Sequence, residues 1–574
     1  MATVKQQTTS NDSSLQIEKH YLLWTVVLSL VFSLSVFAAF YYITHDIFYI
    51  DTDNYTLALR IIDWLQNFQW SEKMFPYYNP PHGYILCWSR LCDLIWGFLA
   101  LPFLLFLPVK EAVFYSGFLF SPLFMVLTMM TIMWGIKPYL ANFQDKSRAI
   151  LIAILTLLFY ATKLHSVFDA TRPDHHSLMC FIFCLNVSVI LRNCKQLNLK
   201  ATLLAGIAGG CGIWGSSAIE GFWVVSIMLF VLAINWIFYS HTIKEQLYYI
   251  LGIFLSVAFA WIINPPFGGW LIIDIQRISI IYAVLTAMMF FSYWYISSLN
   301  LQTKSQKILA LAGGAFLTIA TTLLIFGIDI WCEPIFSSDI WEYCFKYIGE
   351  IQHLKSSQAP NIIIIWSFSI LGGLLLLCGN SKHLINLTFL TIFCYIATAI
   401  FLRFYPYLIM IFSFLSALLL FELMHKGSEN IKFKWLAFSY MVVTTLPFLT
   451  TYIKHEPFKA PQLKNSALVD MLDVPEVVFY QNIDAIGGPY HPNAEGIVDN
   501  YLMWFTTDEN ELKKLIKKHN IRSIYLKSKN RPDYYIEPEK NTDKLYGKVM
   551  TGKNIYPWLK KIGEGHYEVD FTLF

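Results

Sequence analysis

Long apolar runs, separated by short polar segments, make up most of the chain from Tyr21 to Tyr452. Each run covers roughly 18 to 25 residues and carries few charges, unlike the alternating pattern of a half-buried strand or the stripe of a surface helix. Hydrocarbon cannot satisfy backbone N–H and C=O groups, so runs of this length cross a membrane as α-helices. The pattern therefore predicts a bundle of spanning helices.

We expect about thirteen spans, with ends defined to within a few residues. The first follows a polar start and has no small-residue cleavage site, so we interpret it as a retained helix and not as a signal peptide. The spans lie near residues 21–43, 111–136, 147–166, 176–191, 201–218, 222–240, 246–263, 278–297, 308–327, 361–379, 383–402, 406–424 and 435–453.

Basic residues in the short loops predict the orientation of the bundle. Lys5 and Lys19 lie beside the first span, which places residues 1–20 in the cytoplasm as an N-terminal tail. Counting spans from there, the basic short loops, such as those with Lys200 and Lys382, also fall inside. We therefore expect an inner (plasma) membrane protein whose C-terminus is extracytoplasmic.

The apolar stretch from Gly83 to Leu107 is an exception. It carries Arg90 and Asp93, and as a span it would reverse the orientation of every later loop. We expect it to lie along the outer interface as an amphipathic re-entrant segment, within an outer loop of residues 44–110. A second long outer loop is expected over residues 328–360.

The composition changes at the end of the membrane domain, which we place at residues 21–453. Residues 454–574 are rich in lysine and mixed in charge. Within them, TDENELKKLIKKH has the apolar spacing of an amphipathic helix, and IRSIYLKS is typical of a strand. The expected fold class is therefore an all-α polytopic membrane bundle with a small α/β C-terminal domain in the periplasm.

Overall composition agrees with this interpretation. Of the 574 residues, 56% are hydrophobic and 17% aromatic, and the formal net charge is only +3. No basic stripe with interleaved aromatic residues is present, so we expect no nucleic-acid partner. We expect membrane lipid to surround the helices of the chain.

Acidic residues gather at predicted outer helix ends, where a charge near a bilayer is costly and is usually retained for a function. Asp51 and Asp53 follow the first span, and the run DATRPDHHSL places Asp174, His175 and His176 before the fourth. The outer loop over residues 328–360 adds a third cluster, with Glu333, Glu342 and Glu350 as candidates.

Carboxylate oxygens with an imidazole nitrogen suit Mg²⁺ or Mn²⁺, which can neutralise a departing phosphate. A single Asp at a helix end is also common as an N-cap or a solvated loop residue. We favour the functional interpretation for Asp53, Asp174 and His176, and expect His175 to be a structural neighbour or to contact the substrate.

At these residues the chain resembles the catalytic subunit of oligosaccharyltransferase and its single-chain bacterial and archaeal relatives, members of the GT-C glycosyltransferase superfamily. Asp53-Asn54-Tyr55 resembles the family's first acidic motif and Asp174-His175-His176 its second. The resemblance implies a divalent cation held by Asp53, Asp174, His176 and a Glu of the 328–360 loop, for which Glu333 is the predicted ligand. It also implies a polyprenyl-linked sugar donor.

The family places an arginine at the outer start of a late span, where it contacts the lipid-linked phosphate. Leu402-Arg403-Phe404-Tyr405 occupies that place, so Arg403 and Tyr405 are predicted substrate-binding residues. Without the resemblance, an arginine that snorkels to the interface is an equally good interpretation.

The resemblance covers the membrane domain and weakens in the tail. The family's WWDYG motif, which reads the acceptor Ser or Thr, is absent; the comparable stretch is VVFYQNIDAIGGPYHPNAEGIVDNY. The sequence thus favours glycosyl transfer in general over transfer to a protein asparagine. In this stretch Tyr490, His491 and Asn493 are candidate substrate contacts on a Gly/Pro-rich loop, although a plain turn between strands also fits.

The sequence therefore predicts a membrane glycosyltransferase acting on the periplasmic face. Asp53, or Asp51 beside it, would orient the acceptor nucleophile, and with a monophosphate donor Asp53 would serve as general base without a metal. Two alternatives stay open. A transporter or flippase of a lipid-linked glycan should carry charges at the membrane midplane, and a non-catalytic relative would tolerate loss of the acidic residues.

Overall fold

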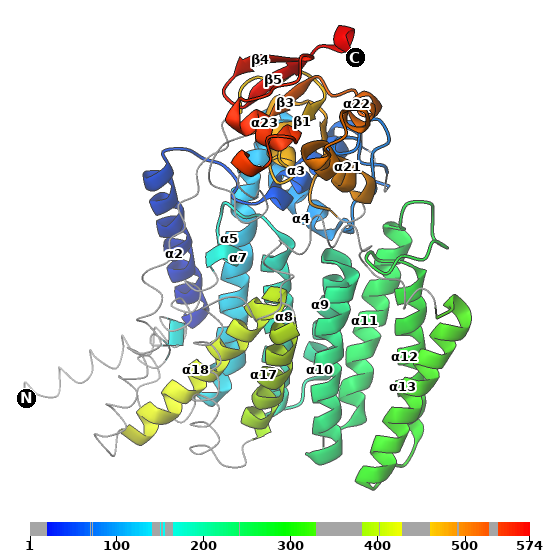
Figure 1. Cartoon of the computed structure of the whole chain (residues 1–574). Coiled ribbons are helices and arrows are strands. Elements are labelled where there is room, and N and C mark those ends of the chain that lie inside the picture. Colours follow the sequence, from blue (N-terminus) through cyan, green and yellow to red (C-terminus); the bar gives the residue numbers. More distant parts are fainter. Residues whose placement is uncertain are drawn as a thin grey trace, which may run out of the picture.

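The structure is a computed structural model, and it places a helical bundle beneath a small mixed domain (Figure 1). It describes residues 20–68, 70–71, 73–140, 150, 153–154, 165–239, 241–328, 382–400, 402–427, 460–490, 493–526 and 538–574.

Seven helices in the described ranges are long and apolar enough to cross a membrane, which makes the chain a multi-pass membrane protein. They are α2 (Tyr21–Thr44), α5 (Val109–Ile136, continued by a short 3-10 turn to Tyr139), α8 (His175–Asn193), α10 (Ala218–Phe238), α11 (Ile243–Ile263), α12 (Ile280–Ser298) and α13 (Lys304–Phe326). The remaining helices of the bundle are α7 (His165–Phe168), α9 (Leu199–Gly215), α17 (Lys382–Ile400) and α18 (Tyr405–Gly427).

All of these helices except the four-residue α7 coincide with predicted spans. The predicted spans over 361–379 and 435–453, and most of 147–166, lie outside the described residues, as does the outer loop from 329 to 360. The polytopic helical fold is confirmed. The cytoplasmic tail before residue 20 also lies outside the described ranges.

Two shorter helices lie between the bundle and the C-terminal domain (Figure 1): α3 (Thr52–Asn67) and α4 (Leu91–Ala100). With 10 residues, α4 has about half the length that a spanning helix needs. A buried ion pair joins the two helices, since Arg60 Nε lies 2.6 Å from Asp93 Oδ2. The interfacial placement of this segment stays a prediction.

The C-terminal domain contains a five-stranded sheet of order β2-β1-β3-β5-β4. β1 is parallel to β2 and β3, whereas β5 is antiparallel to β3 and β4. The strands are β1 (Ala467–Leu468), β2 (Ala485–Ile486), β3 (Ser523–Tyr525), β4 (Leu559–Gly563) and β5 (His566–Val569), and the helices are α20 (Val474–Gln481), α21 (Ala494–Phe505), α22 (Glu509–Lys518) and α23 (Leu545–Thr551). The predicted amphipathic helix and strand, α22 and β3, are both confirmed.

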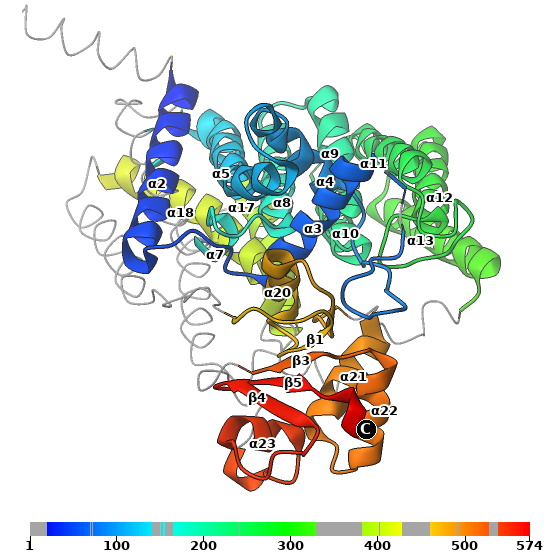
Figure 2. The same ribbon diagram turned by 90° about the horizontal axis from the view of Figure 1, so that it is seen from above.

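The C-terminal domain is attached to the segment before α4. The backbone N–H groups of Ala485 and Gly487 donate to the carbonyl oxygens of Tyr77 and Tyr78 at 3.1 and 3.0 Å, which extends the β2 edge of the sheet onto that segment. Seen from above, the domain is displaced to one side of the bundle (Figure 2). These contacts place the GGPY turn of the domain over the ends of the helices.

Candidate functional site

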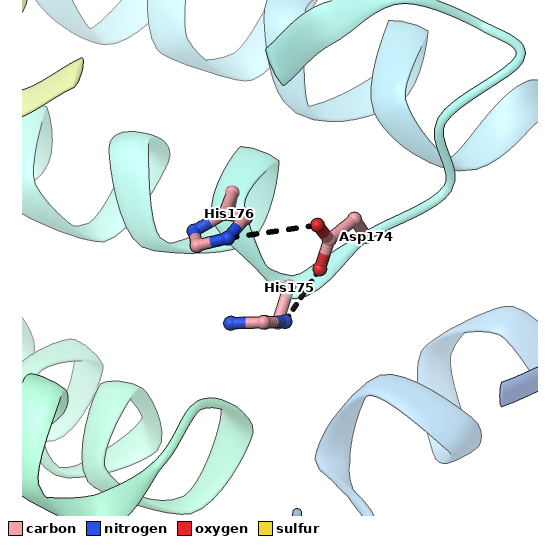
Figure 3. A group of neighbouring side chains, drawn as sticks. All are labelled: Asp174, His175 and His176. Carbon is pink, nitrogen blue, oxygen red and sulfur yellow. Dashed lines mark ion pairs between the residues drawn. The ribbon is translucent and has the colours of Figure 1, made fainter. Parts of the chain in front are cut away.

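The start of α8 carries the most compact group of possible ligands in the described part of the chain (Figure 3). Asp174 occupies the N-cap position, and His175 and His176 form the first turn. His175 Nδ1 lies 2.5 Å from Asp174 Oδ1, and His176 Nε2 lies 3.7 Å from Asp174 Oδ2. All three residues are buried. The second predicted acidic motif therefore brings its three side chains together.

The carboxylate of Asp174 is kept charged by its neighbours. Burial raises its pKa, but His175, His176 and Arg172 outweigh this effect and hold the pKa well below its ordinary value. Asp174 is thus an anion at neutral pH. A buried anion beside two imidazoles is the arrangement expected of a cation ligand or of a group that orients a histidine.

Glu220 supplies a second carboxylate from the start of α10. It is 3% exposed, and its oxygens lie 3.9 Å from His175 Nε2 and 4.0 Å from His176 Nδ1. The structure places it in contact with both histidines, inside the cluster.

Arg403, in the short turn before α18, joins the same cluster. Its Nη2 lies 2.9 Å from Glu220 Oε2 and 2.9 Å from His175 Nε2. An arginine always donates, so His175 Nε2 accepts here, and its Nδ1–H faces Asp174. This contact suits His175 to orient Asp174, and its predicted role as a substrate contact stays a prediction.

Tyr407 also donates to Glu220, at 2.6 Å. Its ring packs against Trp223 and Phe183, with ring centroids 5.7 and 5.1 Å apart. The sequence predicted Tyr405 as a substrate contact, and the structure adds Tyr407 two residues later as a direct partner of the acidic group.

The first acidic motif lies next to the second. Asp51 is the N-cap of α3, where it accepts from the Asp53 backbone N–H at 3.3 Å. Arg172 bridges the two motifs, because its Nη2 lies 2.8 Å from Asp51 Oδ2 and its Nε 3.5 Å from Asp174 Oδ2. Backbone and side-chain bonds to the Thr171 carbonyl strengthen the junction.

Asp53 lies one position into α3 and is half-buried. Burial of Tyr490 raises its pKa well above the ordinary value, and the negative charge of Asp53 raises it further. Burial and the charge of Asp53 likewise raise the pKa of the Cys87 thiol to about 12. Asp53 is therefore close to both the C-terminal domain and the segment before α4. It is not part of the compact Asp174 group, so its metal-binding role stays a prediction.

Tyr490 and Asn493 occupy the turn above the site. The Thr56 hydroxyl is hydrogen-bonded to the hydroxyls of both Tyr490 and Tyr78, at 2.7 Å each. Asn493 is 1% exposed and donates to the carbonyl oxygens of Gly487 and Tyr78. Both residues thus attach the C-terminal domain to the membrane part. His491, Glu333 and the other acidic candidates of the 328–360 loop lie outside the described residues.

The donor set of the Asp174 group fits a divalent ion. One carboxylate and two imidazoles offer ligand atoms that all lie within 4.8 Å of one another. A carboxylate oxygen together with an imidazole nitrogen suits a divalent cation. Because His175 Nε2 accepts from Arg403, Asp174 and His176 are the members best placed to act as ligands without rearrangement.

No protein-family model matches the chain, and no curated protein is similar in sequence. Solved structures are similar in fold. The archaeal oligosaccharyltransferase AglB from Archaeoglobus fulgidus, in complex with an inhibitory peptide and a dolichol-phosphate, aligns with a TM-score of 0.66 and 12% identity over 94% of this chain and 79% of that chain.

Two further structures of the Archaeoglobus fulgidus enzyme agree. The apo form has a TM-score of 0.64 at 13% identity, with 94% of this chain and 79% of that chain covered. The complex with Zn and sulfate has a TM-score of 0.58 at 13% identity, covering 92% and 71%. The chain therefore shares the overall fold of these oligosaccharyltransferase structures, which is the fold that the resemblance at its acidic motifs implies.

Proposed function

We propose that the chain is a membrane glycosyltransferase that moves a sugar or oligosaccharide from a polyprenyl-phosphate or polyprenyl-diphosphate donor to an acceptor on the periplasmic face. The observation that carries the proposal is the convergence of Asp174, His176 and Arg403 at the end of the bundle that faces the C-terminal domain. Asp174 and His176 are two residues apart, whereas Arg403 lies 228 residues beyond His175 along the chain. Their meeting would bring a cation-binding group and a partly exposed guanidinium to the same place.

Arg403 is the residue suited to an anionic donor. Its side chain is 29% exposed, whereas the side chains of Glu220 and His175 are each 3% exposed. A guanidinium has five N–H donors in a planar fork, so Arg403 can hold Glu220 and still donate to a phosphoryl oxygen. The similar archaeal enzyme was solved with a dolichol-phosphate, which supports a lipid phosphate as the ligand.

A divalent ion would be held by Asp174 and His176, with Glu333 and Asp53 as further proposed ligands, and would neutralise the leaving phosphate. His175 keeps Asp174 oriented, and Glu220 keeps Arg403 in place. Asp53, or Asp51 beside it, would orient the acceptor nucleophile next to Tyr490. The similar archaeal enzyme was also solved with Zn and sulfate, which agrees with a cation and an anion at such a site.

The proposal is tested in cells of the source organism that lack the gene. Mass spectrometry of their lipid-linked sugars and glycoconjugates should find an accumulated precursor and a missing product. The wild-type gene should restore the product, and Asp174→Asn should not. Identical profiles with and without the gene would contradict enzyme activity.

The same cells separate the transferase from a flippase. A transferase defect leaves the precursor on the outer leaflet, where membrane-impermeant periodate oxidises its sugar. A flippase defect leaves the precursor on the cytoplasmic leaflet, protected from the reagent. Protection in the deletion strain would therefore favour transport over transfer.

A further inference from the structure

Three basic residues gather at the end of the bundle that is far from the Asp174 group. Lys137 directly follows α5, Arg192 lies in the last turn of α8, and Lys195 comes just after α8 ends. Both helices run away from the C-terminal domain (Figure 1). Since α8 has 19 residues, roughly 28 Å of helix separates its two ends. Lys137, Arg192 and Lys195 are called the basic cluster below.

Each basic side chain of the cluster packs against an aromatic ring. The distances from the charged group to the ring centroid are 4.0 Å for Lys137 and Tyr21, 4.4 Å for Arg192 and Trp134, and 4.9 Å for Lys195 and Tyr139. The charge of Arg192 also acts on the phenols of Tyr21 and Tyr139. The three cations therefore lie near one another, held by rings from α2, α5 and the turn after α5.

No carboxylate pairs with this cluster among the described residues. Glu245 is hydrogen-bonded to Asn193, the neighbour of Arg192, but its oxygens are taken by Asn193 and His241, at 2.6 and 2.9 Å. The other arginine side chains described in the membrane part all pair with a carboxylate: Arg60, Arg90, Arg172, Arg277 and Arg403. The basic cluster thus carries a positive charge that the described part of the chain does not neutralise.

Arg192 keeps most of its hydrogen-bonding groups for a ligand. Its Nη1 donates to the Trp134 carbonyl oxygen at 2.8 Å, which uses one of its five N–H groups. Lys137 and Arg192 are half-buried and Lys195 is exposed, so the cluster is open to a ligand from outside the bundle. A planar guanidinium together with two ammonium groups matches the oxygens of a phosphate.

An exposed apolar stripe begins beside the cluster. Tyr21 is the first residue of α2, and Leu23, Val27, Val31 and Leu34 follow it at helical spacing, each between 40% and 65% exposed. A row of this kind along a spanning helix suits the acyl chains of a lipid, and a soluble phosphate ester would make no use of it. A ligand that uses both features has an anionic head and long apolar tails.

We propose that the basic cluster binds the phosphate headgroup of an anionic phospholipid whose acyl chains lie along the α2 stripe. Basic pockets between spanning helices suit acidic lipid headgroups, because the charges act in a medium that screens them less than bulk water does. The cluster lies at the opposite end of α8 from the Asp174 group, so this lipid is distinct from the proposed sugar donor. Its binding does not depend on the proposed transferase function.

The first test measures lipid binding to the purified full-length protein in detergent by native mass spectrometry. Dioleoyl-phosphatidylglycerol and dioleoyl-phosphatidylcholine are added separately, because they have the same tails and differ in net charge. The wild-type protein should bind phosphatidylglycerol more tightly. Arg192→Gln and Lys195→Gln should each raise the Kd for phosphatidylglycerol roughly fivefold, the effect of one basic residue near an anionic lipid, and leave the Kd for phosphatidylcholine unchanged.

Lys304→Gln is the matched control, because Lys304 also packs against a ring, that of Phe238 at 5.0 Å, but begins α13. Gln302→Ala, in the exposed loop before α13, changes no charge. Both variants should keep the preference for phosphatidylglycerol, and Arg192→Lys should lose less of it than Arg192→Gln. The exposed position of Lys195 keeps the test decisive if Arg192→Gln does not fold.

Three outcomes would overturn the proposal: equal binding of the two lipids by the wild-type protein, an unchanged Kd for phosphatidylglycerol in both cluster variants, or an equal loss in Lys304→Gln. A soluble competitor then separates a lipid from a free phosphate. Glycerol 3-phosphate has the phosphate without the tails, so a large excess should not displace phosphatidylglycerol. Displacement would reveal a site for a soluble phosphate and overturn the lipid assignment.

The second test locates the tails. Phosphatidylglycerol with a diazirine in its acyl chain should label peptides of α2 after irradiation, more strongly than phosphatidylcholine with the same chain. Arg192→Gln should remove this difference between the two lipids. Labelling of α2 that is equal for both lipids in the wild-type protein, or that is unchanged by Arg192→Gln, would overturn the placement of the tails.

Discussion

Glu220 and Arg403 form an ion pair, with Glu220 Oε2 2.9 Å from Arg403 Nη2 and 3.1 Å from Nε. The pair links the start of α10 to the turn before α18. The chain itself thus provides an anionic partner for this arginine. A phosphate that binds Arg403 therefore joins an existing pair and does not neutralise an isolated charge.

The pair makes a prediction about Glu220→Gln, which keeps the shape of the side chain and removes its charge. Breaking a buried pair costs about 3–5 kcal/mol. Arg403 is partly exposed, so we expect a smaller loss of about 1–3 kcal/mol in the free energy of unfolding, together with reduced transfer. Tyr407→Phe, which removes one hydrogen bond to the same carboxylate, should cost less. Equal unfolding midpoints for wild type and Glu220→Gln would contradict this account.

Metal binding should depend on the Asp174 group. Mn²⁺ or Zn²⁺ should raise the thermal midpoint of the purified protein, with a stabilisation of about 2.7 kcal/mol at a hundredfold excess over Kd. Asp174→Asn and His176→Ala should each remove the effect. His241→Ala is the matched control, because His241 lies just before α11 and pairs with Glu245 in the first turn of that helix, away from the site. A shift that persists in both ligand variants would place the metal elsewhere.

The Arg60–Asp93 pair predicts a strong effect on folding of the segment around α3 and α4. Arg60 Nη2 also donates to Asp93 and to the Ser89 carbonyl, and both charged residues are almost fully buried. Asp93→Asn should lower the free energy of unfolding by about 3–5 kcal/mol. Asp63→Asn, which breaks the half-exposed pair with Lys73, should cost at most about 1 kcal/mol. Comparable membrane abundance and midpoints for the two variants would argue against the stated burial.

Asp499 predicts a pH-dependent attachment of the C-terminal domain. His519 bridges Asp499, at 2.7 Å, and the Pro80 carbonyl, at 2.6 Å. Burial raises the pKa of Asp499, but hydrogen bonds from His519 and Lys518 outweigh it and lower the pKa. A carboxylate with a lowered pKa stabilises the fold, and its contribution is complete at a pH above the pKa of the unfolded state, about 3.9. The contribution is lost as the pH falls through the pKa of the folded state.

Asp499→Asn should therefore destabilise the domain by about 1–3 kcal/mol at neutral pH. The difference from wild type should shrink as the pH falls through the folded pKa, because the wild-type carboxylate is then protonated. Hydrogen exchange of α21 amides as a function of pH measures both effects. A difference that is constant with pH would exclude the carboxylate charge as its cause.

The sequence was sufficient for the elements that local patterns determine. Long apolar runs located α2, α5 and the other large helices, because span length follows from membrane thickness. The helix α22 was predictable from its apolar spacing and from Asp508 as its N-cap, whose side chain accepts from Asn510 and Glu511 N–H groups. The Asp174-His175-His176 group could be singled out from the sequence because its three residues are consecutive and lie at the start of one helix.

The partners of that group were not predictable from local patterns. Glu220 and Arg403 are 183 residues apart along the chain. Only the packing of α8, α10 and α18 brings these two residues together. Arg172 lies within a motif that the sequence singled out, but its bridge to Asp51 requires the meeting of two loops. A cavity of about 600 Å³ is lined by residues of three separate segments, 74–87, 274–277 and 493–495, so no single stretch indicates it.

The most direct measurement of the central claim is transfer by the purified full-length protein in liposomes, supplied with lipid-linked sugars and acceptor extracted from cells that lack the gene. We expect a glycosylated product with the wild-type protein and with Gln302→Ala, and none with Asp174→Asn. Product formation at an undiminished rate by Asp174→Asn would contradict the claim that the cluster at the start of α8 is the reaction centre.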